Sequence, residues 1–143
     1  MYNIVMQIRE LDLKELEIAY EVVKQLRVEL SYKEFEDLIY DMRHMDYKMF
    51  GLFDKDRLIT YAGASICTNL YNKRHLYMYE LVTDEDYRGQ KYGKKMLDYL
   101  VDYAKVGACE NVVLTSGLQR EDAHRLYKNY GFDKKSHMFV KEV

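Results

Sequence analysis

The segment Leu81-Val-Thr-Asp-Glu-Asp-Tyr-Arg-Gly-Gln-Lys-Tyr-Gly-Lys-Lys-Met96 decides how this sequence folds. It begins inside a stretch, 76–83, that is apolar on both faces apart from Glu80, as is typical of a central strand. Over 91–106 the apolar positions recur at helical spacing, and Gly107 is the expected end of that helix. The segment therefore predicts a buried strand, a short loop and the start of a helix.

The loop between this strand and this helix has the features of an anion-binding site. It contains Gly89 and Gly93, and residues 88–95 hold four cations and no acid. A helix N-terminus leaves backbone N–H groups without partners and carries a partial positive charge, and glycines let a ligand approach closely. These features favour phosphate or pyrophosphate; the alternative is an ordinary turn with a solvated basic flank. The loop is neither a P-loop nor a dinucleotide fingerprint.

Hydrophobic periodicity predicts the elements on either side. Asp12 and Ser31 are expected to cap the first two helices, and Glu34 completes a capping box with Ser31. The predicted strands are 4–8, 49–53, 58–68, 76–83, 112–115 and 132–140, and the predicted helices are 13–30, 31–42, 91–106 and 121–130. The order β-α-α-β-β-β-α-β-α-β predicts an α/β (α+β) fold. We expect a mixed, mostly antiparallel central sheet with helices on both faces.

Length and composition limit the class of protein. The chain has 143 residues, which we expect to form a single domain over 1–143. It carries 22 basic and 24 acidic residues, a net charge of −2 that disfavours nucleic acid as a partner. No apolar run reaches the roughly 18 residues of a membrane span, and no signal peptide is recognisable. We therefore expect a cytoplasmic protein with no membrane partner.

The cysteines and histidines show no pattern of metal ligands. Cys67 and Cys109 are far apart and lack CxxC spacing, so we expect no metal and two small buried side chains. For His124 and His137, structural or surface roles are expected.

Two motifs resemble those of a known family. Arg88-Gly-Gln-Lys-Tyr-Gly93 resembles the acyl-CoA-binding loop, Q/R-x-x-G-x-G/A, of the GCN5-related N-acetyltransferases (GNAT). Ala123-His-Arg-Leu-Tyr-Lys-Asn-Tyr-Gly-Phe132 is similar to the family's A-x-x-L/F-Y-x-x-x-G-F. Both lie on the expected elements, and the order of elements along the whole chain also resembles this fold. The resemblance implies a GNAT-like N-acetyltransferase that uses acetyl-CoA as co-substrate and acetylates a primary amine of a small molecule or protein by direct transfer.

The resemblance also implies roles for individual residues. The backbone of Leu81, Val82 and Thr83 would hold pantetheine and the acetyl carbonyl, and the N–H groups from Gln90 to Lys94 would cradle the pyrophosphate. The remaining cofactor-binding residues that it implies are Arg88, Gly89, Gln90, Lys91, Tyr92, Gly93, Lys94 and Arg120. Tyr127 would be the general acid near the sulfur; a plain core position on an apolar helix face is the alternative.

Two positions depart from the family pattern. Lys91 replaces the central glycine of the loop, and a lysine does not adopt a positive φ cheaply, so either the loop needs no such angle or its geometry differs. Lys91 is also the feature that favours the alternative function, a catalytically silent module that binds CoA. Arg120 stands where the family often has Asn, and contacts to CoA or to substrate are both open.

The sequence defines the general base of the implied reaction less clearly than the general acid. Glu80 interrupts a central strand, where a carboxylate must be either paired or functional. It is our candidate general base, with an ion pair to a lysine or arginine as the alternative; Asp84, Glu85 and a water chain are rivals. The sequence leaves the acceptor and the oligomeric state open, a homodimer included.

Overall fold

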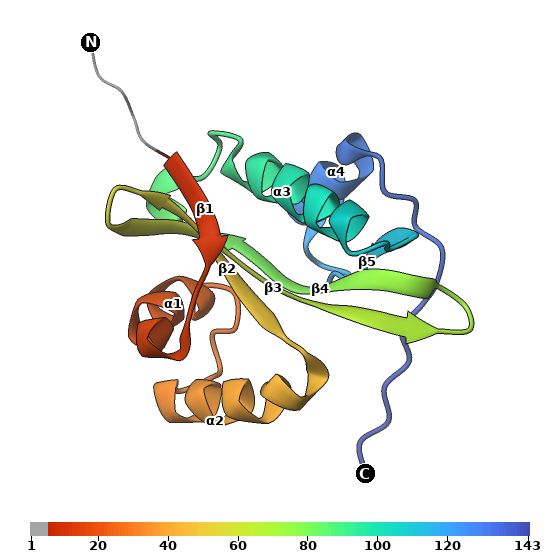
Figure 1. Ribbon diagram of the computed structural model, residues 1–143, viewed down its shortest axis with the longest axis horizontal. Coiled ribbons are helices and arrows are strands. Elements are labelled where there is room, and N and C mark those ends of the chain that lie inside the picture. Colours follow the sequence, from red (N-terminus) through yellow and green to blue (C-terminus); the bar gives the residue numbers. More distant parts are fainter. Residues whose placement is uncertain (1–5) are drawn as a thin grey trace. The chain divides into compact units, whose positions relative to one another are not determined.

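The computed structural model describes residues 6–143 (Figure 1). The chain divides into two compact units, one ending at Val113 and one comprising Leu114–Val143, and each is described by itself. The first predicted strand is β1 (Met6–Glu10); Ile4 and Val5 of that prediction lie outside the described residues.

A five-stranded sheet in the order β1-β2-β3-β4-β5 forms the centre of the first unit. Strands β1 to β4 pair antiparallel with their neighbours, and β5 joins beside β4 after the crossover helix α3, which makes the sheet mixed. This confirms the predicted fold class. The bounds are β2 (Lys48–Asp54), β3 (Arg57–Asn69), β4 (Lys73–Thr83), α3 (Tyr92–Val106) and β5 (Asn111–Leu114).

Helices cover both faces of this sheet, as predicted (Figure 1). On one face α1 (Leu16–Val23) and α2 (Tyr32–Met42) form a buried core with side chains of the sheet that include Tyr61 and Val82. On the other face α3 buries Met96, Leu97 and Leu100, and Phe50 of β2 packs edge-on against Tyr99 and Tyr103. The aliphatic and aromatic contacts of α3 fix its position relative to the sheet.

The predicted helix ends are confirmed where the signal is local. Asp12 caps a short 3₁₀ helix (Leu13–Glu15) that leads into α1, and Ser31 caps α2. α3 ends at Gly107, and α4 (Glu121–Tyr130) ends at Gly131, which has a φ of 119°. These residues can be recognised from sequence because each cap needs only a neighbouring side chain or a glycine.

Two predicted elements differ in the structure. The strand predicted over 132–140 is absent, because Met138, Phe139 and Val140 are exposed and a strand needs a neighbour to pair with. The first helix ends at Val23 rather than near Leu30, and residues 24–30 form successive turns. Leu26 packs against the core from this loop. Its position therefore continues the apolar spacing of the preceding helix although it lies outside that helix.

The capping box of α2 allows a direct test of how much its cap residues stabilise the helix. The Ser31 hydroxyl accepts from the Glu34 amide, and the Glu34 carboxylate accepts from the Ser31 amide, both at 3.1 Å. Ser31→Ala should lower the free energy of unfolding by about 1 kcal/mol in urea denaturation. Glu34→Gln, which preserves the acceptor, should cost clearly less; equal stability of Ser31→Ala and the parent protein would contradict this account.

Candidate functional site

The last residues of β4 extend past the short strand β5. The Glu110 amide donates to the Arg74 carbonyl at 2.7 Å, so β5 starts beside the beginning of β4. β5 has four residues and β4 has eleven. Leu81, Val82 and Thr83 therefore lie beyond the end of β5, and β3 is the strand that pairs with them.

The loop that follows β4 leads into the N-terminus of α3. Residues 88–91 are exposed, Gly89 has a φ of 81°, and a Cβ added to Gly89 would meet nothing within 4 Å. Lys91 is the N-cap residue of α3 and makes no side-chain cap. The first amides of a helix have no intrahelical acceptor. The first N–H groups of α3 therefore have no acceptor within the helix, as an anion site requires.

Lys91 adopts the backbone conformation that a glycine would adopt. Its φ of 67° and ψ of 21° lie in the left-handed region, which costs a residue with a Cβ about 1–2 kcal/mol. The sequence left two alternatives, a loop that needs no positive angle or a loop of different geometry. The structure instead shows the positive angle at Lys91 itself, so the expectation that a lysine would avoid it is wrong. Lys91 therefore places a positive charge at a left-handed position of the loop.

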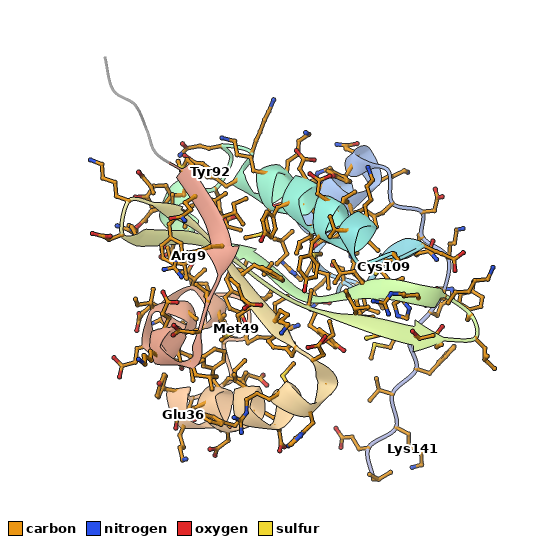
Figure 2. The ribbon with its side chains drawn as sticks, viewed as in Figure 1. Arg9, Glu36, Met49, Tyr92, Cys109 and Lys141 are labelled. Carbon is orange, nitrogen blue, oxygen red and sulfur yellow. The ribbon has the colours of Figure 1, made fainter. Side chains whose placement is uncertain are left out.

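Charges around this loop do not stabilise α3 in the usual way. The first turn of α3 has no acid and contains Lys94 and Lys95, which lie at the positive end of the helix dipole (Figure 2 labels the neighbouring Tyr92). Lys94 pairs with Asp98 at 3.4 Å, and the Arg88 Nε donates to the Thr83 carbonyl at 3.1 Å. A bound anion would turn this unfavourable arrangement into a favourable one.

Glu80 has a partner on each carboxylate oxygen. Its side chain is 15% exposed; Oε1 accepts from the Tyr47 hydroxyl at 2.6 Å, and Oε2 accepts from the Arg27 guanidinium at 3.2 Å. The structure thus contains the ion pair that the sequence gave as the alternative for Glu80. The rival Asp84 pairs with Arg57 at 3.5 Å and caps the 3₁₀ helix after β4.

Two tyrosines extend this network into the core. An ionised carboxylate only accepts, so Tyr47 donates to Glu80 and Tyr61 donates to the Tyr47 oxygen over 2.8 Å. Burial raises the pKa of Tyr47 well above its ordinary value, and nearby acidic groups reinforce the effect. Burial also raises the pKa of Tyr61, again with a contribution from Glu80. Both hydroxyls therefore remain protonated donors.

The network depends on a glycine opposite Glu80. Gly63 pairs with Glu80, and a Cβ there would overlap the Tyr47 hydroxyl and lie 2.8 Å from Glu80 Oε1. Glu80 is predictable from the sequence, whereas its partners Tyr47, Tyr61 and Arg27 are not among the predicted site residues. The available signal was Gly63, because a glycine inside a buried strand often marks a close approach.

In the second unit, Tyr127 lies on the apolar face of α4. Its side chain is 8% exposed, and its ring packs edge-on against Phe132 at a centroid distance of 5.7 Å. Burial raises the pKa of Tyr127, and the positive charge of Arg120 partly opposes this. Arg120 thus lies close enough to Tyr127 for its positive charge to lower the pKa of that hydroxyl.

Two histidines make structural contacts with backbone carbonyls. Nδ1 of the buried His75 lies 2.8 Å from the Lys73 carbonyl, and His124 Nε2 lies 2.8 Å from the Gly117 carbonyl. Cys67 and Cys109 are half-buried thiols, less enclosed than predicted. Over residues 6–143, no three His, Cys, Asp or Glu side chains gather as metal ligands, and no helix is both long and apolar enough to cross a bilayer.

This fold and its motifs define a class of acyl-transferring enzyme. The sequence matches the Acetyltransferase (GNAT) family over residues 7–132, a range that includes both motifs, and the chain belongs to this family. It is 34% identical over 127 residues to the uncharacterized N-acetyltransferase YhdJ of Bacillus subtilis, an alignment that covers 87% of this chain and 89% of that protein.

Solved structures share the fold at low sequence identity. The aminoglycoside N-acetyltransferase AAC(6')-Iy in complex with CoA superposes with a TM-score of 0.87 at 14% identity, covering 99% of this chain and 97% of the other. A predicted acetyltransferase of Clostridium acetobutylicum, solved with acetyl-CoA, gives a TM-score of 0.78 at 19% identity, with 96% of each chain covered.

The left-handed angle of Lys91 generates a prediction about stability. Lys91→Gly should be more stable than Lys91→Ala by about 0.5–1 kcal/mol, because both remove the charge and only glycine relieves the backbone strain. At Lys94, inside α3, the order should reverse by about 1 kcal/mol. Urea denaturation of the four variants checks this, and the same order at both positions would contradict the loop geometry.

The close approach at Gly63 generates a second prediction. Gly63→Ala should lower the free energy of unfolding by about 1–3 kcal/mol, because the added methyl displaces Tyr47 or Glu80. In Gly107→Ala the methyl meets the flexible end of Ile66, so that variant should lose less than about 1 kcal/mol. Thermal denaturation gives both values, and a fully stable Gly63→Ala would show that the network is loosely packed.

Proposed function

We propose that this protein transfers the acetyl group of acetyl-CoA directly to a primary amine of a small molecule or protein. The observation that carries the proposal is the start of α3. There, two left-handed residues, Gly89 and Lys91, expose backbone amides that the chain does not cap, in a first turn with cations and no acid. A diphosphate satisfies both the amides and the charge.

The end of β4 is the part of the chain proposed to bind the pantetheine and acetyl group of acetyl-CoA. In this proposal the backbone of Leu81, Val82 and Thr83 binds pantetheine and the acetyl carbonyl, and support comes from their position beyond the end of β5. Amides from Gln90 to Lys94 hold the diphosphate. The cofactor site is completed by Arg88, Gly89, Lys91, Tyr92, Gly93 and Arg120.

The reaction needs a neutral amine and a protonated leaving group. Glu80 takes the proton of the acceptor ammonium, and the amine nitrogen then attacks the thioester carbonyl carbon. Main-chain N–H groups of β4 stabilise the oxyanion. The C–S bond breaks as the tetrahedral intermediate collapses, and Tyr127 gives its proton to the sulfur. The attacking nitrogen loses its extra proton to solvent to give the neutral amide, and solvent returns a proton to Tyr127. A raised pKa keeps Tyr127 protonated at neutral pH, as an acid must be.

The acceptor is proposed as a primary amine and no more narrowly. Names among similar proteins include an aminoglycoside N-acetyltransferase and the aminoalkylphosphonate N-acetyltransferase of Salmonella typhimurium, the latter 33% identical over 64 residues, 45% of this chain and 42% of that protein. These acceptors share an amino group and little else, so the amine is the part of the substrate that the comparison supports.

Removal of one hydroxyl tests the chemical step. Tyr127→Phe should lower kcat by about 10²-fold or more while the affinity for CoA is retained, because the thiolate then leaves without a proton donor. Tyr130→Phe is the matched control, since it removes a hydroxyl from the same helix. Release of free CoA thiol with a panel of primary amines, and product mass, provide the measurement.

Each outcome of that assay has a definite meaning. Unchanged turnover in Tyr127→Phe would remove Tyr127 from the mechanism and leave the family assignment intact. CoA binding by the parent protein without product from any amine would identify a silent binding module instead of an enzyme.

A further inference from the structure

One arginine of the loop after α1, Arg27, contacts the chain of β4. Arg27, in the turns 24–30, places Nη2 3.0 Å from the Tyr79 carbonyl and 3.2 Å from Glu80 Oε2. The same nitrogen thus joins a backbone carbonyl and a carboxylate more than 50 residues away in the chain. This contact links the α1–α2 loop to the strand that carries the proposed base.

The carbonyl that Arg27 contacts belongs to an irregular residue of the sheet. Gly63 pairs with Glu80 and the next residue, Ala64, pairs with Met78, so Tyr79 is the extra residue of a β-bulge. A bulge takes its extra residue out of the ladder, and the freed backbone groups need other partners. Arg27 supplies the donor for the Tyr79 carbonyl.

A second side chain of the same loop, that of Gln25, holds the chain just after the end of β4. The Glu85 amide donates to the Gln25 side-chain oxygen at 2.8 Å. Gln25 and Arg27 therefore hold the chain on both sides of Leu81–Thr83, the residues proposed for the thioester. The loop is thus fixed at one point on β4 and at a second point just after β4, at Glu85.

Arg27 also completes the environment of Glu80. Tyr47 binds Oε1 from within the core, and Arg27, with 44% of its side chain exposed, binds Oε2 from the solvent side. Two donors on two oxygens fix the rotation of the carboxylate plane. Without Arg27, one oxygen and the carbonyl of the bulge lose their donor together.

We propose that Arg27 is a positioning residue, which holds the bulge of β4 and the Glu80 carboxylate in the orientation that receives the proton of the acceptor amine. This inference rests on the proposed function, in which Glu80 is the base. Arg27 acts through Glu80 and touches neither CoA nor acceptor in this account. Its removal should therefore slow turnover and leave CoA binding intact.

A double-mutant cycle tests this dependence. Kinetics are measured for the parent protein, Arg27→Gln, Glu80→Gln and the double variant, with CoA affinity from calorimetry. Arg27→Gln should lower kcat about tenfold or more with unchanged CoA affinity, because the base is misplaced. In the Glu80→Gln background the same change should cost no more than about twofold, since the group it positions is gone.

Two further variants separate positioning from folding. Arg27→Lys should recover most of the lost kcat, because an ammonium can still pair with Glu80. Arg43→Gln is the matched control: Arg43 is another exposed arginine whose Nε contacts a backbone carbonyl, that of Tyr40, at 3.2 Å, outside the Glu80 network. It should leave kcat unchanged.

The outcomes distinguish this inference from the proposed function. Normal kcat in Arg27→Gln, or an equal loss with and without Glu80, would overturn the positioning role, and a loss in Glu80→Gln would leave the base in place. Full activity of Glu80→Gln would overturn the base itself, and the role of Arg27 with it.

Discussion

Backbone N–H groups at the start of a helix need acceptors, and at α3 the chain supplies none from its N-cap residue. The two helical segments of the first unit that begin at Leu13 and Tyr32 are capped by Asp12 and Ser31, whereas the N-cap residue of α3, Lys91, makes no side-chain cap. The aromatic contacts of Phe50 on β2 help to hold α3 against the sheet. Much of the first unit can therefore be understood as a scaffold that keeps these amides exposed.

Three departures from local rules fall between residues 80 and 95. A carboxylate interrupts a central strand, a lysine adopts a left-handed angle, and cations occupy the wrong end of a helix. Each costs stability where it occurs, and each makes sense if the segment binds an anionic cofactor and moves a proton. Such conflicts between local preference and fold are expected at functional sites.

Much of the architecture was predictable because its signals are local. Hydrophobic period and capping residues predicted the bounds of α4 and the box at Ser31, and the two motifs predicted the family. The partners of Glu80 were not predictable, since Tyr47 and Arg27 lie far away in sequence and reach it only through strand register and a bulge. Segment 132–140 carries apolar residues at both of its ends, but apolar residues do not by themselves supply a neighbouring strand.

The central claim is that the amides at the start of α3 bind the diphosphate of CoA. Titration of isotope-labelled protein with CoA, followed by amide NMR, tests it most directly. The account predicts large, saturable shifts for the N–H groups of Gln90 to Lys94, with the capped amides at the start of α2 unmoved. Saturating CoA that leaves the amides of residues 90–94 unchanged would contradict the account.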